Sequence, residues 1–258
     1  MLPTVLSPGT QARQYAAAGA GVAAFSPLSL SPLVWFDASV ANSLFQDTGG
    51  TTPATADADP VALWKDQSGN ANNASQATGS SRPTLKLAIK NSKNIVRFDG
   101  VNDFLNMPNL SINQTYTICA VSKTTVGVNF ICQGDRSVGH RQFQSRYNTG
   151  LVWMMIAFNT VPAPFIVSQV SAQGTWELVE GICDATPQIK TYVNTVGGTP
   201  LAITGTPASG TTVMQIGTDE GGSALNGDIA ELLFFNSALG TTDRQNVETY
   251  LNAKWAIY

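Results

Sequence analysis

The sequence has little charge. It holds 14 Lys and Arg and 17 Asp and Glu among 258 residues, so 12% of the residues are charged, about half the share that is usual in globular domains. No run of Lys or Arg occurs and the net charge is −3. Because phosphate neutralisation needs clustered cations, nucleic acid is excluded as a partner. No segment approaches the roughly 18 consecutive apolar residues of a membrane helix, so we expect no membrane insertion.

Histidine and cysteine are also scarce. The one histidine, His140, would have to serve any Ser–His–Asp triad or zinc site. The three cysteines form no Cys-x-x-Cys pair, and phosphate loops and dinucleotide fingerprints are absent. Cys119 and Cys183 lie in alternating apolar segments, so we expect them to be buried free thiols.

Acidic residues do not pair as glycoside hydrolysis requires. A retaining mechanism needs two carboxylates about 5–5.5 Å apart, and on one strand these stand at positions i and i+2. Glu177 and Glu180 are three residues apart, as are Asp228 and Glu231, so each pair is expected on opposite faces. The sequence therefore predicts that the protein is not an enzyme. A glycoside hydrolase is the less favoured alternative, in which two strands each contribute a carboxylate.

What the sequence does have is small polar residues around short apolar segments. It contains 27 Thr, 20 Ser, 18 Asn and 14 Gln, together with 43% hydrophobic residues, which suffice for a core. Alternating or continuous apolar segments, separated by Gly, Asn, Asp and Pro, predict many short strands, as in a β-sandwich or jelly roll. These segments are 115–123, 129–133, 151–158, 176–183, 188–193, 212–216 and 229–235.

One helix is predicted, over residues 242–255. Thr242 and Gln245 have the spacing of a capping box, which would start the helix. Apolar residues then recur on one stripe, so the helix is expected to cap the sandwich. These residues are Val247, Tyr250, Leu251 and Trp255.

Residues 1–32 differ from the rest of the chain. They are rich in Pro, Ala and Gly and have no amphipathic period. We expect an extended N-terminal arm over 1–32 and one jelly-roll domain over 33–258. Because an arm without a core is ordered only by burial against something else, it is expected to anchor the domain to a neighbouring subunit, with contacts from Arg13, Tyr15 and Phe25.

Several segments, in this order and spacing, resemble one family. They are an opening strand at 33–39, a Trp-Lys-Asp-Gln-Ser-Gly-Asn turn at 64–70, a Phe-Asp-Gly turn at 98–100, adjacent strands at 176–180 and 192–194, and a closing strand at 227–236. Together they resemble the concanavalin A-like lectin/glucanase superfamily, in its laminin-G-like jelly-roll branch. The resemblance implies an all-β sandwich. It is nearest to domains of bacteriophage virion proteins and of secreted bacterial proteins.

The resemblance implies a non-enzymatic virion structural protein, either a capsid decoration or a tail component, at the virion surface. Its partners would be other virion proteins or further copies of itself, as a homo-oligomer, with a trimer expected for a tail or capsid component. Host-surface adhesion through a cell-surface glycan is compatible with this role. The alternative is an extracellular, lectin-like carbohydrate-binding protein. Fold alone does not decide between them.

Two candidate sites can be named from the residues. Sugar sites combine aromatic rings with polar neighbours, which here predicts a glycan site in the central strands and loops. It would comprise Trp153, Tyr147, Phe143, Arg146 and Asn148. Oxygen side chains at alternate positions also suggest calcium as the one candidate cofactor, bound by Asp66, Asn70 and Asp99. The alternative is that Asp66, Ser68 and Asn70 hydrogen-bond a tight turn, as such residues commonly do.

Overall fold

The computed structural model describes residues 25–125, 128–134, 141–146, 152–157, 172, 174–186, 188–202, 210–212, 214–218 and 224–258. For residues 128–134, 141–146, 152–157 and 210–212 only the backbone is described. Residues 1–24, which hold Arg13 and Tyr15, lie outside the described residues.

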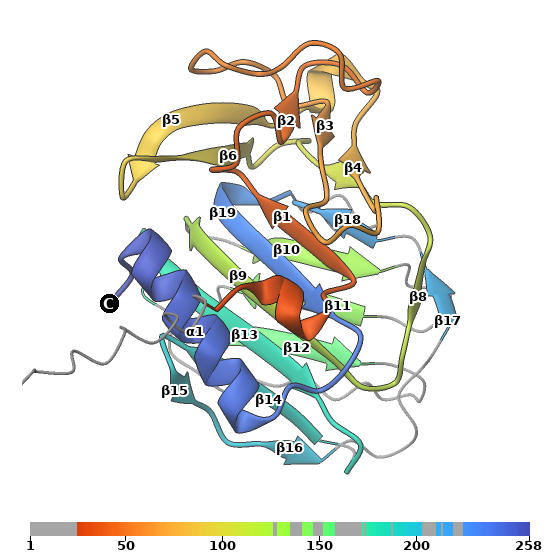
Figure 1. Cartoon of the computed structure of the whole chain (residues 1–258), viewed down its shortest axis with the longest axis vertical. Helices are drawn as coiled ribbons and strands as arrows, with labels where there is room; N and C mark the ends of the chain where they lie inside the picture. The colour runs from red at the N-terminus through yellow and green to blue at the C-terminus, as the bar shows by residue number, and fades with distance from the viewer. Residues whose placement is uncertain are drawn as a thin grey trace, which may run out of the picture.

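Two antiparallel sheets pack face to face (Figure 1). The nine-stranded sheet has the order β15-β14-β13-β9-β19-β6-β5, with β1 added beside β19 and β16 beside β14. Its strands are β1 (Val34–Asp37), β5 (Thr84–Lys90), β6 (Lys93–Asp99), β9 (Tyr116–Thr124), β13 (Glu177–Cys183), β14 (Gln188–Val193), β15 (Val196–Gly197), β16 (Leu201–Ala202) and β19 (Asn226–Phe235).

The eight-stranded sheet has the order β12-β11-β10-β18-β7-β4-β3-β2. Its strands are β2 (Leu44–Phe45), β3 (Leu63–Trp64), β4 (Ala74–Ser75), β7 (Leu105–Asn106), β10 (Val128–Gly134), β11 (Arg141–Arg146), β12 (Val152–Ala157) and β18 (Met214–Ile216). A further pair, β8 (Leu110–Ile112) and β17 (Gly210–Thr212), lies apart from both sheets. This confirms the predicted all-β jelly-roll sandwich with a single C-terminal helix.

The main core lies between the sheets and is lined by one face of each. Phe36 packs against Trp64, with ring centroids 5.4 Å apart, and Tyr116 stacks on Phe234 at 5.5 Å. All four side chains are essentially buried. Cys119 and Cys183 are buried free thiols, as predicted.

Helix α1 (Thr241–Trp255) covers the outer face of the nine-stranded sheet (Figure 1). Its N-cap is Gly240 and no side chain caps it, so the capping box predicted at Thr242 is wrong. Asp243 in the first turn and Lys254 in the last have the signs that the helix dipole favours. Beneath α1 lies a second apolar cluster, which includes Leu233 and Trp255.

The end of the predicted arm packs on its own domain. The short 3-10 helix η1 (Pro27–Leu30) lies beside α1, and Pro27 is buried. The Phe25 ring packs edge-on against Tyr250, 6.3 Å between centroids, and both Phe25 and Leu30 contact the cluster beneath α1. The first eight described residues therefore belong structurally to the jelly roll.

A bulge in β19 changes the faces of its acidic residues. The pairing with β9 shifts between Ile229 and Glu231, so that Asp228 lies opposite Lys123 and Glu231 opposite Val121. One extra residue in a strand restores the same side to positions three apart. Asp228 and Glu231 therefore share a face, and the prediction that they lie on opposite faces is wrong for this pair.

Candidate functional site

The loop after β3 clamps the start of β1. The Asp66 carboxylate accepts hydrogen bonds from the backbone N–H groups of Trp35 (2.8 Å), Ser68 (2.9 Å) and Asn72 (3.0 Å), and from the Ser68 hydroxyl (2.6 Å). The amides of Asn70 and Asn72 donate to the carbonyl of Leu33, 3.1 and 2.9 Å away. These contacts tie the loop to the strand, which is the work of a structural turn.

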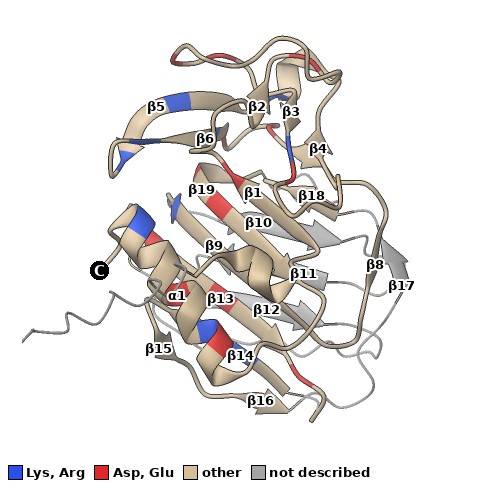
Figure 2. Ribbon diagram, in the orientation of Figure 1, with Lys and Arg blue, Asp and Glu red and all other residues tan. Residues whose placement is uncertain are grey.

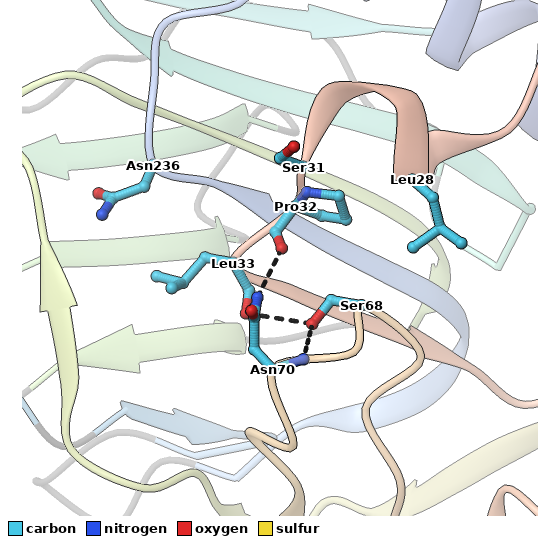
Figure 3. A pocket seen from close by; sticks show the side chains of 7 residues that line it. All are labelled: Leu28, Ser31, Pro32, Leu33, Ser68, Asn70 and Asn236. Atoms are coloured by element: carbon cyan, nitrogen blue, oxygen red, sulfur yellow. Dashed lines mark hydrogen bonds between the residues drawn. The ribbon is translucent and has the colours of Figure 1, made fainter.

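A pocket of about 270 Å³ lies between this loop and η1 (Figure 3). Two of the polar side chains that line it already form hydrogen bonds within the protein. The Asn70 amide also donates to the Pro32 carbonyl at 3.0 Å, and the Asn236 side chain is bonded to the backbone of Asn113 and Ser111. The remaining lining residues are Leu28, Ser31, Leu33 and Ser68. The pocket therefore offers a ligand few side-chain groups that are not already used.

The third candidate calcium ligand, Asp99, belongs to a different turn. Its Oδ1 accepts from the backbone N–H groups of Val101 (2.7 Å) and Asn102 (3.2 Å). Nearby, burial and the charge of Asp99 raise the pKa of Asp103 to about 6. The structure thus joins Asp66 to Asn70 through Ser68, and places Asp99 at the end of β6. Among the described residues, no three His, Cys, Asp or Glu side chains gather closely enough to hold a metal ion.

Charged residues occur on α1 and on the strands beneath it (Figure 2), and three of their side chains form a first cluster. Lys254 binds both Asp37 and Glu231, the latter at 2.7 Å. Glu231, which is only 1% exposed, also accepts from the indole N–H groups of Trp35 (2.7 Å) and Trp255 (2.6 Å). Burial and the charge of Asp37 raise the pKa of Glu231. Two carboxylates here share one ammonium, away from solvent.

A second buried cluster lies further along the same helix. Arg244 binds Glu248 on its own helix and Glu180 on β13, the latter at 3.4 Å. The Arg244 guanidinium also lies 3.9 Å from the centre of the Tyr192 ring. Burial, followed by the charge of Glu248, raises the pKa of Glu180. Both acidic clusters therefore attach α1 to its sheet.

The outer face of the eight-stranded sheet carries uncharged polar side chains at β4, β7 and β18. Ala74, Leu105 and Ile216 point into the core, so the alternate residues Ser75, Asn106 and Gln215 lie on the outer face, where each is half-buried. We call Ser75, Asn106 and Gln215 the amide row. Asn106 pairs with Ser75 on one side and with Gln215 on the other. The Gln215 amide donates to Asn106 Oδ1 at 2.9 Å.

The register extends this row at the backbone level. Gln133 on β10 lies opposite Gln215, and Gln142 on β11 lies opposite Gln133. Sequence reasoning missed the row because its members belong to strands far apart in the chain. Only strand pairing reveals it.

At β2 and β3 the outer face is closed. Phe45 and Leu63, on the side of these strands away from the core, are only 4% and 6% exposed. Phe45 pairs with Pro53 through an isolated bridge, and the Lys65 ammonium lies 4.2 Å from the Phe45 ring centre. The loop after β2 therefore covers this end of the face, and the amide row begins beside it.

Three of the five predicted glycan residues belong to strands at the other end of this sheet. Phe143 and Arg146 are on β11 and Trp153 is on β12. By backbone register, Phe143 pairs with Cys132, which pairs with Ile216 and not with Gln215. The side chains of these residues, and all of Tyr147 and Asn148, lie outside the described residues. This glycan site stays a prediction.

Comparisons with known proteins agree with this architecture. Domain 4 of AbnA, a GH43 extracellular arabinanase from Geobacillus stearothermophilus, solved in complex with arabinotriose, is 14% identical and has a TM-score of 0.56 over 71% of this chain and 91% of its own. The receptor binding domain of botulinum neurotoxin mosaic serotype C/D is 13% identical, with a TM-score of 0.58 over 86% of this chain. The chain spans 51% of that toxin domain. No curated protein matches the sequence.

A family model supplies the assignment. The model described as the concanavalin A-like lectin/glucanases superfamily matches residues 99–243, more than half of the chain. The match runs from the end of β6 to the first turn of α1, and so includes most strands of both sheets. The chain therefore belongs to the concanavalin A-like lectin/glucanases superfamily.

Proposed function

We propose that the protein is a non-enzymatic carbohydrate-binding module that acts outside the cell. The observation that carries the proposal is the contrast between its two outer faces. The carboxylates of Asp37, Glu180 and Glu231 are buried in ion pairs beneath α1, whereas β4, β7 and β18 present uncharged hydrogen-bonding side chains on the opposite face. Binding sites of this chemistry fix a ligand without reacting with it.

Two further observations support the proposal. A structure with the same fold, the arabinanase domain, is seen in complex with arabinotriose. In the described part of the chain, no helix is long and apolar enough to cross a membrane.

Affinity gel electrophoresis of the full chain tests this function. We expect slower migration in gels that contain a soluble neutral polysaccharide, and no release of reducing ends after prolonged incubation with it. Unchanged migration in arabinan, β-glucan and mannan would contradict binding. Release of reducing ends would contradict the non-enzymatic part of the proposal.

We also propose an assembly role for residues 1–24, as the anchor of a virion component. Phe25 packs on Tyr250, so residues 1–24, which hold Arg13 and Tyr15, are joined to the domain beside α1. A segment rich in Pro, Ala and Gly gains order only against a partner, here another virion protein or a second copy of the chain.

The mass in solution of the full chain and of a chain that begins at Phe25 tests this role. An oligomer of the full chain, such as a trimer, and a folded monomer of the shorter one would support it. Equal masses would exclude self-assembly through this segment.

A further inference from the structure

We propose that the amide row, Ser75, Asn106 and Gln215, binds an extended, uncharged saccharide that runs across the strands of the eight-stranded sheet. This inference rests on the carbohydrate-binding function proposed above and assigns its site and ligand class.

The hydrogen-bonding groups of the row fit a polyhydroxyl chain. The Gln215 Nε2 donates to Asn106 Oδ1 at 2.9 Å, which fixes the two amides side by side. The bond leaves the Asn106 amino group as a donor and Gln215 Oε1 as an acceptor on neighbouring strands. A sugar hydroxyl both donates and accepts, so it can bind either group. Because the amides already hold one another, binding orders few additional rotamers.

The Ser75 hydroxyl adds a third position. Within the described residues it has no hydrogen-bond partner, although the side chain is half-buried beside Asn106. A hydroxyl supplies one donor and two acceptor positions. The row therefore offers polar groups on three successive strands.

The ligand class follows from the absence of charge. None of the residues that β4, β7 and β18 contribute is charged. Two described cations lie nearby: the Lys65 ammonium is stacked on the Phe45 ring, and the Arg82 guanidinium donates to the backbone carbonyls of Gln46, Gln76 and Ala77. A carboxylated or phosphorylated chain would lose part of its hydration here without a cation to compensate. The row thus favours a neutral chain over an acidic one.

The length of the ligand follows from strand spacing. Neighbouring strands are about 4.8 Å apart, so three of them span roughly 10 Å. This exceeds a single sugar ring. By backbone register, Gln133 and Gln142 follow Gln215 along the strand order, whereas the covered residues Phe45 and Leu63 close the row at the other end. The chain should therefore extend from β4 toward β11.

The test compares two paired-amide variants of the full chain. The row variant carries Asn106→Ala and Gln215→Ala. The matched control carries Gln245→Ala and Asn246→Ala, which removes two exposed amides from α1 on the opposite side of the molecule. Gln215→Met, which keeps the side-chain volume, serves as a second row variant if the double variant unfolds.

Each protein is run in affinity gels with arabinan, β-glucan, mannan and polygalacturonate, and is titrated with arabinose and arabinotriose. We expect the native protein to bind at least one neutral chain, and to bind a trisaccharide more tightly than a monosaccharide. The row variant should lose about tenfold or more in affinity, since two hydrogen bonds are removed. The control should bind as the native protein does.

The outcomes separate the site from the function. If the native protein binds a neutral chain and the row variant binds it equally well, the site is wrong and the function stands. If the native protein binds only polygalacturonate, the ligand class is wrong. If it binds none of the four polymers, the proposed function fails and this inference fails with it.

Discussion

Beneath α1, on the outer face of the nine-stranded sheet, the polar side chains are charged, buried and bound to one another. By contrast, the side chains that β4, β7 and β18 present on the outer face of the eight-stranded sheet are uncharged and half-buried. Glu231 illustrates the first face, with a carboxylate that accepts from Lys254 and two indoles. Asn106 illustrates the second, with one hydrogen bond to Gln215 and its amino group left over.

This difference separates polar groups that stabilise the fold from polar groups that are available to a ligand. Buried charges must be fully paired, because an uncompensated one costs several kcal/mol, and fully paired groups have nothing left for a ligand. Half-exposed amides lose little when unpaired and can exchange water for sugar hydroxyls. Two of the acidic residues that would suggest an enzyme, Glu180 and Glu231, thus attach a helix, and Asp228 is paired with Arg97 on β6. The amides are the groups available for binding.

Removing the cation shared by two carboxylates beneath α1 should destabilise the protein most. Lys254→Met leaves Asp37 and Glu231 buried without their ammonium. We expect the free energy of unfolding to fall by about 3–5 kcal/mol, as measured by urea denaturation. Lys93→Met, a half-buried lysine on β6, is the matched control and should cost less than about 1 kcal/mol.

The amide row sharpens this contrast. Asn106→Ala with Gln215→Ala removes two polar side chains from the other face, where the lost bond is worth about 1 kcal/mol. If this double variant were as unstable as Lys254→Met, the two faces would not differ in the way described, and the amides would be structural.

Truncation should distinguish residues 25–32, which pack beside α1, from residues 1–24. A chain that begins at Phe25 keeps the contacts of Phe25, Pro27 and Leu30 beside α1, so its stability should equal that of the full chain. A chain that begins at Leu33 loses them and should be destabilised by about 2 kcal/mol, the value for one large buried apolar side chain. Thermal unfolding of the three proteins measures this. Equal midpoints for the two truncated chains would contradict the packing of 25–32.

The pH dependence of stability should also arise from the buried acidic residues beneath α1. Because burial and Glu248 raise the pKa of Glu180 above 4.5, the folded state holds a proton that the unfolded state releases above that pH. The contribution of Glu180 is thus fully present below pH about 4.5 and is lost as the pH rises toward the folded pKa, by up to about 1.4 kcal/mol per pH unit. Glu180→Gln removes this slope. It should be more stable than the native protein at pH 7 and equal to it at pH 4.

Asp57→Asn is the control with the opposite sign. A hydrogen bond from Lys86 lowers the pKa of this exposed carboxylate, so its contribution is present above pH about 3.8 and is lost in acid. The variant should therefore be slightly less stable than the native protein at pH 7. If Glu180→Gln behaved in the same way, the raised pKa of Glu180 would be contradicted.

The sequence predicts strands better than it predicts what their faces carry. Alternation located β9, β13 and β14 almost to the residue, because each of these strands has one or both faces buried. The bulge at Ala230 left no mark in the alternation, so the faces of Asp228 and Glu231 were predicted wrongly. The helix was found from its apolar stripe, yet its start was misplaced because Gly240 offers no side-chain cap to recognise.

Local sequence patterns could not predict the candidate site. Asn106 and Gln215 touch although 109 residues separate them, and no spacing rule connects residues that meet only through strand order. Single Asn and Gln residues in short strands look like solvent-facing positions. Their significance arises from pairing across β4, β7 and β18, which is a property of the topology.

Calcium should have the smallest effect of all. The Asp66 carboxylate already accepts four hydrogen bonds, from Trp35, Ser68 and Asn72, and a cation would have to displace donors that hold β1 in place. A bound ion would raise the unfolding midpoint in proportion to its occupancy. We therefore expect the midpoint in millimolar calcium and in chelator to agree within about 1 °C. A larger rise of the midpoint in calcium, abolished by Asp99→Asn, would instead establish the site predicted from Asp66, Asn70 and Asp99. It would show that the turn after β6 and the loop after β3 bind the ion together.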